Sequence, residues 1–561
     1  MASAGKIGCF VHRNMSGRHL PVNRGLRIEQ LTKNAPIDEQ WAARFANLLG
    51  GGDRRAGGAY RGAVTVIANP AEILTPAEMG QADELTVAAG TSSFALMERA
   101  GLAVAEAVRR IAPVGARVSV MTGPGKNGGD GFIAARVLAE AGYLVSVGLL
   151  AARDRLSGDA AFAAASWTGF SKGLSPAIAE EADVVVDALF GAGLDRPVEG
   201  TAAQTINAVN RSRVPVLAVA LPSGINGATG RVMGTAIEAD ESVTFFRLKP
   251  GHLLLPGRAY CGRLTVADIG ISPDCLDVIH PKTWHNTPAR WSLPALSIDQ
   301  NKYTRGHAVV VSGPATRTGA ARLAARGALR SGAGLVTLAS PLDALAENGA
   351  HLTAIMLLPM EGAGGLAAIL TDERRNAVVI GPALGLDQQT IDLVETALAS
   401  RAAVVLDADA LTAFTGKSER LFEVIKRREA GVVMTPHDGE FSKLFPDLAT
   451  NESKLERARL AAARSGAVVV LKGPDTVVAS PDGNALIANN APPQLATAGS
   501  GDVLAGMIGG LLAQKMTAFE AAAAAVWLHG EAGISKGRGL IAEDLPEVLP
   551  AVFTELANSS R

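Results

Sequence analysis

Short apolar runs alternate with longer helical stretches along most of this chain. From 74 to 111 the apolar residues recur at helical spacing, and Thr75 followed by Pro76 suits a helix cap and first turn. Runs rich in β-branched residues then alternate with Ala-rich helical stretches, the pattern of βαβ units in a mainly parallel, doubly wound sheet. The runs of this first block are RVSVMTG (117–123), LVSVGLL (144–150), DVVVDALF (183–190) and VPVLAVALPSG (214–224).

A second alternating block begins after a proline-containing stretch with little periodicity. It starts at HAVVVSG (307–313), continues as far as AVVVLKG (467–473), and ends in an Ala-rich helical region. The fold class is therefore predicted as α/β, with two doubly wound domains. The expected organisation is a poorly ordered N-terminal extension at 1–71, a first domain at 72–271, a linker at 272–296 and a second domain at 297–561.

The first 70 residues differ from the rest in composition. They carry ten Lys and Arg against four Asp and Glu, contain the run GGGDRRAGG, and lack the apolar core of a secretory signal. An Arg-rich organellar transit peptide is the alternative, although such peptides are poor in acidic residues.

Composition and charge narrow the class of protein. With 561 residues the chain has room for two to four domains of roughly 150 residues each. Its formal net charge of −1 gives no electrostatic reason to expect a nucleic acid or an anionic membrane as partner. Cys9, Cys261 and Cys275 form neither a disulfide framework nor a zinc motif, which favours a reducing, cytoplasmic location. The apolar run from Val503 is interrupted by glycines and follows Asp502 directly, so a buried helix is expected rather than a membrane span.

A glycine-rich loop, MTGPGKNGGDG, joins the first strand of the first domain to a helix. Gly123, Gly125 and Gly128 match the dinucleotide fingerprint G-x-G-x-x-G. In that fingerprint a pyrophosphate lies on the helix N-terminus, yet here Asp130 is expected at that terminus and would repel it. The loop therefore argues against an ordinary dehydrogenase and for another ligand geometry.

Further polar residues are expected at the carboxyl ends of neighbouring strands, where open α/β sheets form their sites. Asp187 and Ser223 each follow a strand, and Asn127 lies in the glycine-rich loop. Their oxygen atoms are hard ligands that suit a cation. The alternative is that each side chain caps a helix or braces a turn.

Taken in order, PGKNGGDG, VDALFGAGLDRP, LPSGINGATG and VTFFRLKPGH resemble the N-terminal domain family of NAD(P)H-hydrate epimerases over about 74–271. The resemblance implies a Rossmann-like epimerase domain that binds a hydrated nicotinamide nucleotide, with a potassium ion held by Asn127, Asp187 and Ser223. It also implies contacts to this substrate from Lys126, Asn127, Gly128, Gly129, Asp130, Gly191, Ala192, Gly193, Leu194, Asp195, Arg196, Pro197 and Ala220.

The sequence departs from the epimerase pattern at two of these positions. Lys126 stands where the family has an asparagine, and Ala220 stands where it has an aspartate before the PSG turn. That aspartate is the family's expected acid and base, and an alanine methyl cannot transfer a proton. Asp130 in the facing loop is the nearest substitute carboxyl. A non-catalytic nucleotide-binding or interaction module is the alternative for this domain.

The strongest motif of the second domain is ATAGSGDVLAGMIGGLLA, in which Gly499, Gly501 and Asp502 stand at the start of an apolar helix. Backbone N–H groups of such a turn form an anion hole for a phosphoryl group, and Asp502 can accept the proton of an attacking hydroxyl. Lys472 in VVLKGPDTVV suits a phosphate as a point charge. The alternatives are an ordinary helix cap for the turn and a solvated strand end for Lys472. No Walker-type G-x-x-x-x-G-K-[ST] motif occurs in the sequence.

The blocks of this domain resemble the ribokinase-like superfamily and, within it, the ADP/ATP-dependent NAD(P)H-hydrate dehydratases over about 297–555. They include NKYTRGHAVVVSG, IGPALG, LDADAL, MTPHDGEFSKL, LKGPDT and ATAGSGDVLAGMIGGLLAQ, in that order. The resemblance implies ADP as co-substrate, magnesium, and Asp502 as the catalytic base. It implies nucleotide binding by Lys472, Gly473, Pro474, Asp475, Thr476 and Gly501, and hydrate binding by Ala321, Gly385, His437 and Asp502. Ala383 and Asp438 are mild departures, standing where the family usually has glycine and proline.

Together the two resemblances imply repair of hydrated NAD(P)H. The first domain would interconvert the R and S hydrates. The second would phosphorylate the S hydrate with ADP, releasing AMP and then phosphate to regenerate NAD(P)H. The protein is expected in the cytoplasm as a homo-oligomer without nucleic-acid or membrane partners. A ribokinase-like small-molecule kinase fused to a non-catalytic nucleotide-binding module is the alternative, and a stable phosphorylated product would distinguish it.

Overall fold

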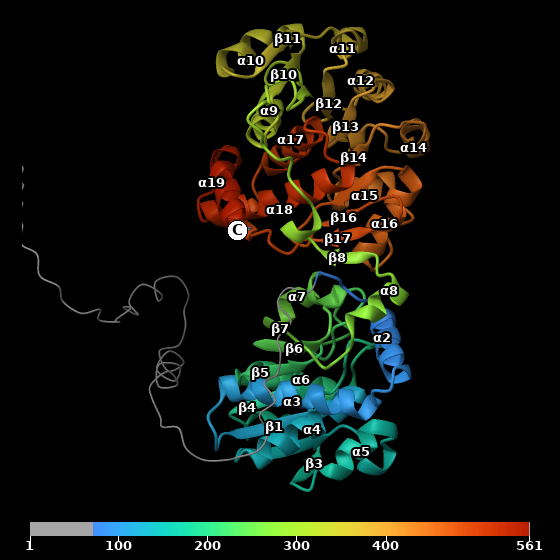
Figure 1. Cartoon of the computed structure of the whole chain (residues 1–561), viewed down its shortest axis with the longest axis vertical. Helices are drawn as coiled ribbons and strands as arrows, with labels where there is room; N and C mark the ends of the chain where they lie inside the picture. Colours follow the sequence, from blue (N-terminus) through green and yellow to red (C-terminus); the bar gives the residue numbers. More distant parts are fainter. Residues whose placement is uncertain (1–70, 560–561) are drawn as a thin grey trace, which may run out of the picture. The chain divides into compact units, whose positions relative to one another are not determined.

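The computed structural model describes residues 71–559, all of which belong to one compact unit of the chain. The predicted N-terminal extension lies, except for Ala71, outside the described residues. The chain is organised as two α/β halves, each built on its own sheet (Figure 1). The predicted fold class, α/β with two doubly wound domains, is confirmed.

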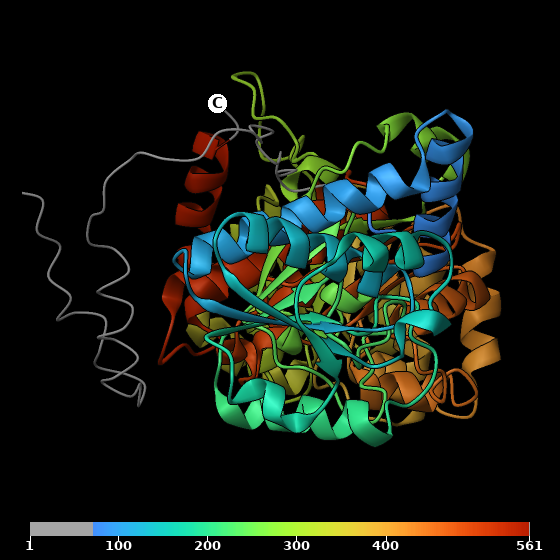
Figure 2. The ribbon, with the colours of Figure 1, turned by 90° about the horizontal axis from the view of Figure 1, so that it is seen from below.

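The first half contains a seven-stranded sheet in the order β3-β2-β1-β4-β5-β6-β7, and all neighbouring strands are parallel. Helices cover both faces, because α3 and α4 pack in one apolar cluster with the strands and α6 packs in another. Figure 2 shows α3 and α6 on opposite sides of this sheet. The strands are β1 (Arg117–Thr122), β2 (Leu144–Leu149), β3 (Ser171–Gly173), β4 (Val184–Ala188), β5 (Val216–Val219), β6 (Glu241–Phe245) and β7 (Arg263–Ala267); the helices are α2 (Pro76–Ala88), α3 (Ser93–Ile111), α4 (Lys126–Glu140), α5 (Gly158–Ser166), α6 (Gly200–Ser212), α7 (Gly257–Tyr260) and α8 (Leu276–Ile279).

The second half contains a ten-stranded sheet in the order β11-β10-β9-β12-β13-β14-β15-β16-β17-β8. One apolar cluster joins a face of the sheet to α9, α17, α18 and α19, and another joins the opposite face to α11, α12, α14, α15 and α16. The strands are β8 (Thr283–His285), β9 (His307–Val311), β10 (Leu335–Ser340), β11 (Met356–Pro359), β12 (Arg375–Ile380), β13 (Ala403–Leu406), β14 (Val432–Met434), β15 (Val468–Leu471), β16 (Val477–Ala479) and β17 (Ala485–Ile487). The helices are α9 (Gly319–Arg330), α10 (Leu345–His351), α11 (Gly362–Leu370), α12 (Gln388–Ala399), α13 (Asp409–Thr412), α14 (Ser418–Lys426), α15 (Asp438–Leu444), α16 (Lys454–Ser465), α17 (Ser500–Ala513), α18 (Ala518–Lys536) and α19 (Asp544–Ser559).

Three short strands at the end of the second sheet have no counterpart among the predicted elements. β16 pairs antiparallel with both β15 and β17, and β8 pairs parallel with β17. β8 lies within 272–296, where the sequence indicates a linker. Each of these strands has only three residues, which is too short for a periodic pattern to be recognised.

The start of α2 follows the prediction from Thr75 and Pro76. The Thr75 hydroxyl accepts from the Glu78 N–H at 3.2 Å, and a Glu78 carboxylate oxygen accepts from the Thr75 N–H at 2.7 Å. This reciprocal capping box satisfies two N–H groups at the helix start.

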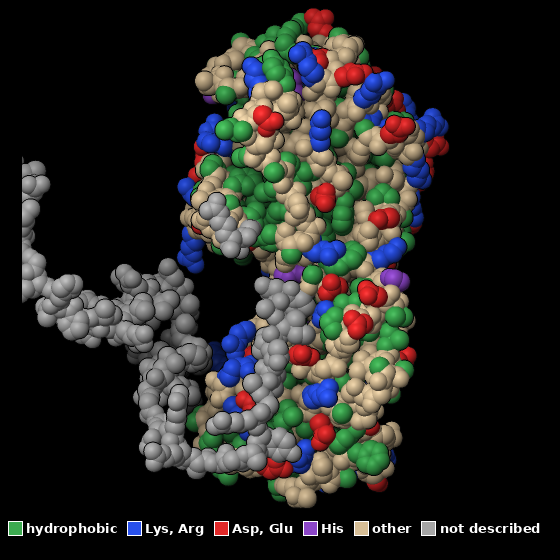
Figure 3. All heavy atoms as spheres, in the orientation of Figure 1, with side chains coloured by type: hydrophobic (Ala, Val, Ile, Leu, Met, Phe, Trp, Pro, Cys, Tyr) green, Lys and Arg blue, Asp and Glu red, His purple; other side chains and the backbone are tan. Residues whose placement is uncertain are grey.

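The long apolar run of the sequence lies in α17, which has 14 residues and is buried along most of its length. Between residues 71 and 559, helices of the length and apolarity needed to cross a bilayer do not occur. Over the part of the surface in Figure 3 that belongs to the second half, Lys and Arg side chains are interspersed with Asp and Glu.

Close packing between α9 and α17 fixes the position of the Gly-Ser-Gly-Asp turn. A Cβ atom added at Gly506 would lie 1.9 Å from the Ala324 carbonyl oxygen, and one at Gly510 would lie 2.4 Å from the Ala328 carbonyl oxygen. Only glycine permits so close an approach of the two helix backbones. The glycines of the apolar run therefore let α17 pack closely against α9, and this packing places the N-terminus of α17 at the carboxyl ends of the strands.

Candidate active sites

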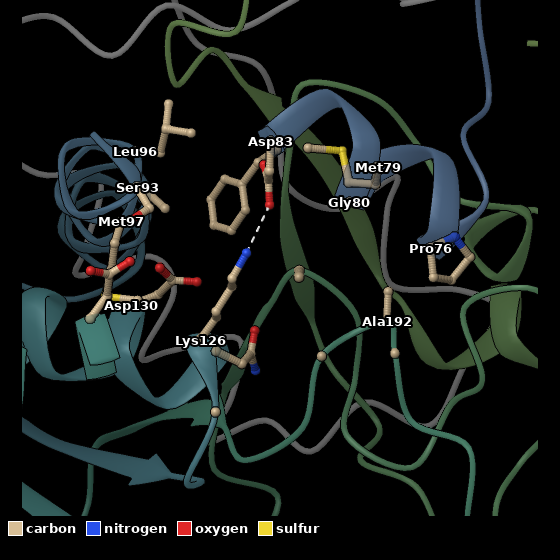
Figure 4. Close-up of a pocket in the computed structure, with 18 of the residues that line it drawn as sticks. Pro76, Met79, Gly80, Asp83, Ser93, Leu96, Met97, Lys126, Asp130 and Ala192 are labelled. Atoms are coloured by element: carbon tan, nitrogen blue, oxygen red, sulfur yellow. Dashed lines mark hydrogen bonds and ion pairs between the residues drawn. The ribbon is translucent and has the colours of Figure 1, made fainter. Parts of the chain in front are cut away.

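A cavity of about 1040 Å³ lies in the first half, between α2, α3, the start of α4 and the chain segments that follow β4 and β5. Figure 4 shows side chains from α2, α3 and α4 around it. The predicted substrate-binding residues that line it are Lys126, Asn127, Asp130, Gly191, Ala192, Gly193, Leu194, Asp195, Arg196 and Ala220; Gly128, Gly129 and Pro197 are not among its lining residues.

The glycines of the first loop permit close approaches between backbone segments. A Cβ atom added at Gly123 would lie 1.8 Å from the Leu189 carbonyl oxygen, and one at Gly128 would lie 1.9 Å from the Gly123 carbonyl oxygen. These contacts press the start of α4 against the segment that follows β4. The fingerprint glycines thus bring two walls of the cavity together.

The position expected for Asp130 is wrong. α4 begins at Lys126, so Asp130 lies one turn inside the helix, buried to 8% exposure. Burial raises the pKa of its carboxyl well above the ordinary value, and the Asp83 carboxylate raises it further. The raised pKa makes the carboxyl easier to protonate, which weakens the repulsion of an anion that the sequence pattern predicted.

Asp187 and Ser223, two of the three predicted potassium ligands, are in direct contact. The Ser223 hydroxyl and N–H donate to the Asp187 carboxylate at 2.6 and 2.7 Å. The third residue, Asn127, lies beside the same loop, because a Cβ atom added at Gly191 would be 3.4 Å from the Asn127 amide oxygen. Asp187 and Ser223 therefore meet at the ends of β4 and β5, and Asn127 lies at the cavity wall beside the loop that follows β4.

The Asp187 carboxylate lacks a cationic side chain in the described part of the chain. It is fully buried, and burial raises its pKa to about 6 in spite of the donors from Ser223 and Leu189. A buried carboxylate beside the Ser223 hydroxyl, which itself lies 3.2 Å from the Phe190 carbonyl oxygen, offers oxygen atoms of the kind that bind a cation. The residues present therefore fit a potassium ion.

Ala220 lies just after β5 at the wall of the cavity, with φ of 62°. This left-handed region is one that aspartate and asparagine tolerate better than alanine. The His252 ring fixes its carbonyl group: Nδ1 accepts from the Lys249 N–H at 2.9 Å, so Nε2 carries the proton and donates to the Ala220 oxygen at 2.8 Å. Burial lowers the pKa of His252 to about 3, so the ring is neutral.

Lys249 and His252 lie in the block VTFFRLKPGH, and the sequence predicted no role for either side chain. Lys249 lines the cavity, yet its ammonium donates to Thr244 Oγ1 at 3.0 Å and to the carbonyls of Phe245 and Arg247 at 3.2 and 2.9 Å. Burial lowers the pKa of Lys249 to about 8. Because all three of its N–H donors are engaged, Lys249 holds the chain after β6 in place.

In the second half, the N-terminus of α17 and the Lys472 side chain meet. A Cβ atom added at Gly501 would lie 3.4 Å from Lys472 Nζ. The same nitrogen donates to Asp407 Oδ1 at 2.8 Å and lies 4.0 Å from a Glu440 oxygen. The predicted phosphate-binding lysine therefore lies beside the predicted anion hole, held by two carboxylates.

Asp502 lies in the first turn of α17, and its carboxyl has a strongly altered affinity for protons. Burial is the main reason that its pKa is raised to about 7, and the Asp407 carboxylate adds to the effect while Lys472 opposes it. Such a value suits a group that takes and returns a proton near neutral pH. Ser500 beside it is buried and lies 3.2 Å from the His529 ring nitrogen.

Segment 472–476 forms a tight turn after β15. The Gly473 N–H donates to Thr476 Oγ1 at 3.2 Å, and that hydroxyl donates to the Gly473 carbonyl at 2.7 Å. Asp475 accepts from Lys454 Nζ at 2.6 Å and from the Leu255 N–H at 2.9 Å. The Asp475 carboxylate thus supports the turn, and the Pro474 carbonyl accepts from Arg258 at 2.9 Å.

The predicted hydrate-binding residues of this half occupy different elements. His437 caps α15, with Nδ1 accepting from the Gly439 N–H at 2.9 Å while its side chain is 60% exposed. The Gly385 N–H donates to Asp409 at 2.9 Å, and Ala321 is buried in α9. The pKa of Asp502 reflects charges at Asp407, Asp409 and Glu440, which ties the loops after β13 and β14 to the same site.

Asp407, Asp409, Glu440 and His529 are site residues that the sequence did not single out. The first two lie in LDADAL and Glu440 lies in TPHDGEF. The acidic side chains within these two blocks are the signal by which the sequence could have identified them. Within 71–559, no cluster of three or more His, Cys, Asp or Glu has the arrangement of a metal centre. Magnesium is commonly held by one or two carboxylates together with the phosphates of a nucleotide, so these carboxylates fit a nucleotide-bound ion.

Comparisons with known proteins agree with this division of the chain. Residues 93–251 match the family described as YjeF-related protein N-terminus, and residues 308–549 match the NAD(P)H-hydrate dehydratase family. The chain is 37% identical to a bifunctional NAD(P)H-hydrate repair enzyme of Moorella thermoacetica, over 86% of this chain and 97% of that one. Identity to the Synechocystis enzyme of the same name is 34%, over 85% and 94%.

A solved structure also resembles part of the chain. It is an ADP/ATP-dependent NAD(P)H-hydrate dehydratase from Bacillus subtilis, 30% identical, covering 47% of this chain and 94% of that protein with a TM-score of 0.42. The matches to both halves and the identity over nearly the full length of the relatives lead to one conclusion. The chain belongs to the family of bifunctional NAD(P)H-hydrate repair enzymes.

Proposed function

We propose that this protein restores hydrated NADH and NADPH to their reduced forms, with ADP as phosphoryl donor. The observation that carries the proposal is the meeting of Asp502, at the N-terminus of α17, with Lys472 at the end of β15. A proton acceptor, a cation and exposed backbone N–H groups at one point are what transfer of a phosphoryl group to a hydroxyl requires.

Asp502 acts on the hydroxyl of the hydrate. Its carboxylate takes the hydroxyl proton as the oxygen bonds to the β-phosphorus of ADP, and AMP leaves. Phosphate then departs from the ring carbon while the neighbouring carbon loses a proton, which restores the ring double bond. The sum of these steps is ADP and hydrate giving AMP, phosphate and NAD(P)H.

Lys472 and the N-terminus of α17 hold the phosphate groups. Burial lowers the pKa of Lys472, but the carboxylates of Asp407 and Glu440 outweigh it and leave the pKa raised, so the side chain stays a cation. The N–H groups of the Gly499 turn add the positive end of the helix dipole. Bound magnesium would supply further positive charge to the phosphates, and Asp407, Asp409 and Glu440 are the side chains in reach of this site.

The cavity of the first half binds the same hydrated nucleotide. Its wall includes the predicted contacts from the loops after β1, β4 and β5. Asn127, Asp187 and Ser223 hold a potassium ion, which would fix the loop after β4 that forms part of this wall. Of the carboxyl groups that line the cavity, that of Asp130 is buried, and the aspartate expected at position 220 is absent, so we propose that epimerisation is slow.

The decisive experiment uses the purified full chain with separated R and S hydrates, ADP or ATP, and magnesium. Recovery of reduced-nicotinamide absorbance from the S hydrate, with one free phosphate per turnover, is the expected result. A stable phosphorylated product without recovery of absorbance would replace the proposal with a small-molecule kinase. A mixture of R and S hydrates tests the epimerisation proposed for the first half. The R hydrate contributes to the recovered absorbance only after it has been converted to the S hydrate. Cytoplasmic location and homo-oligomer formation remain predictions.

A further inference from the structure

A lysine and an aspartate face each other across the cavity of the first half. Lys126 Nζ, from the first residue of α4, lies 3.3 Å from Asp83 Oδ2 on α2, and Figure 4 shows the pair with its dashed contact. The Lys126 side chain is 72% exposed, whereas Asn127 and Asp130 next to it are 9% and 8% exposed. The pair therefore lies at the entrance of the cavity, with the buried polar groups behind it.

Two cations of the cavity wall are available to an anionic ligand. The Lys126 side chain is 72% exposed and its partner Asp83 is 27% exposed, so water screens the pair and it contributes little. Arg196 is exposed and forms no ion pair among residues 71–559. The third cation, Lys249, already donates to three oxygens of its own chain segment. Lys126 and Arg196 are therefore the two cations open to a phosphate group, and Lys126 is the one next to the buried amide of Asn127.

An unsatisfied donor adjoins this lysine. Asn127 lines the cavity and is nine-tenths buried, yet its amide nitrogen has no hydrogen-bond partner within the described part of the chain. A buried donor without a partner costs free energy unless a ligand supplies the acceptor. The amide oxygen of Asn127 serves the cation site, so its nitrogen remains for an acceptor in the cavity.

We propose that Lys126 is a phosphate-binding, specificity-determining residue that exchanges Asp83 for a phosphate group of the bound dinucleotide. The uncharged reduced ring then lies deeper, beside Asp130 and the apolar side chains of Leu96 and Met97. The phosphates remain at the exposed entrance, where their desolvation costs least. Asp83 holds the lysine in place in the empty cavity and competes with the ligand. This proposal rests on the proposed substrate but concerns binding alone.

The test measures dissociation constants of the full chain for NAD⁺ and NADP⁺ by calorimetry at low salt. Lys126→Asn is expected to weaken binding to the first half about threefold to tenfold, as loss of one charge-assisted contact does. Asp83→Asn is expected to tighten it about twofold to fivefold, because the competing carboxylate is gone. Both effects are expected to shrink as salt is raised.

Arg117→Asn is the matched control. Arg117 forms an exposed ion pair with Asp183 in the same half and does not line the cavity. Binding to the second half is common to all variants, so a difference between Lys126→Asn and Arg117→Asn reports on this cavity. Because both pairs are exposed, the thermal unfolding temperatures of the variants are expected to stay close to that of the wild type.

The ligands separate the two sources of phosphate. Equal weakening of NAD⁺ and NADP⁺ by Lys126→Asn assigns the contact to the pyrophosphate, and weakening of NADP⁺ alone assigns it to the 2′-phosphate. Unchanged affinity for both, or weaker binding by Asp83→Asn, would overturn the proposal. Failure of the proposed repair activity appears instead as absent recovery of absorbance from the hydrates, which this binding measurement does not involve.

Discussion

The ammonium nitrogen of Lys472 lies 2.8 Å from Asp407 Oδ1, although the two residues are 65 positions apart in the chain. The Asp407 oxygen also accepts from the Thr435 hydroxyl at 2.6 Å, so three strand ends, those of β13, β14 and β15, meet at this carboxylate. The ion pair holds the lysine beside the N-terminus of α17. The proposed nucleotide phosphate would therefore meet a cation that is already in place.

Asp502→Asn is expected to abolish ADP-dependent repair while the protein still binds ADP. The amide keeps the size of the side chain but cannot take the hydroxyl proton, and loss of a general base typically costs about 10²–10⁴ in rate. Single-turnover recovery of absorbance gives the rate, and calorimetry gives the ADP affinity. Wild-type turnover by this variant would remove Asp502 from its assigned role.

The rate of dehydration is expected to rise with pH through about pH 7. The Asp502 pKa of about 7 lies above the ordinary value because burial disfavours the charged form, so below pH 7 the base is increasingly protonated. The value of kcat/KM for the S hydrate is expected to fall about tenfold per pH unit on the acid side. A profile that stays flat between pH 5.5 and 8 would contradict the assignment.

Ala220→Asp is expected to accelerate exchange between R and S hydrates by about 10²–10⁴, the usual contribution of one acid or base group. Position 220 has φ of 62°, which aspartate tolerates, so the variant is expected to fold. Exchange is followed by separating the epimers after incubation with the full chain. Asp130→Asn is the companion variant. The wild type could instead exchange the epimers rapidly, with no change in Ala220→Asp and loss of exchange in Asp130→Asn. That result would place the proton transfer at Asp130.

The unfolding temperature is expected to be higher in potassium chloride than in choline chloride at the same ionic strength. At ten times the dissociation constant, a bound ion adds about 1.4 kcal/mol to the free energy of unfolding. Asp187→Asn removes the charged ligand, and the variant is expected to show no difference between the two salts. Equal unfolding temperatures of the wild type in both would leave Asp187 and Ser223 as a structural pair.

Gly506→Ala is expected to lower the free energy of unfolding by about 1–3 kcal/mol, because the added methyl meets the Ala324 carbonyl at 1.9 Å. Gly364 in α11 is the matched control: it is also helical, but a Cβ atom there has no neighbour within 4 Å. Gly364→Ala is expected to be stabilising by about 0.5–1 kcal/mol through helix propensity. Thermal unfolding of both variants tests the packing of α9 on α17.

Local sequence was sufficient for the order of the longer strands and helices and for the glycine-rich segments between them. A buried parallel strand appears as a continuous apolar run, and a glycine-rich segment such as 123–131 has a recognisable spacing. Both signals lie in short stretches of the chain, so both can be recognised from the sequence alone. The Thr75 cap and the apolar helix that starts at the Gly-Ser-Gly-Asp turn are confirmed for the same reason. The short strands β8, β16 and β17 were not predicted, because they are defined by pairing with neighbouring strands and not by a pattern of their own.

Tertiary structure alone decided which charged groups are partners and in which direction burial shifts their pKa values. Asp130 was expected at a helix terminus as a charged group, but α4 begins four residues earlier and buries it, which raises its pKa. The pairing of Lys126 with Asp83, and of Lys472 with Asp407, joins elements far apart in sequence. Burial and long-range charge set a pKa and the partner of an ion, and both depend on distances that arise only when the chain has folded.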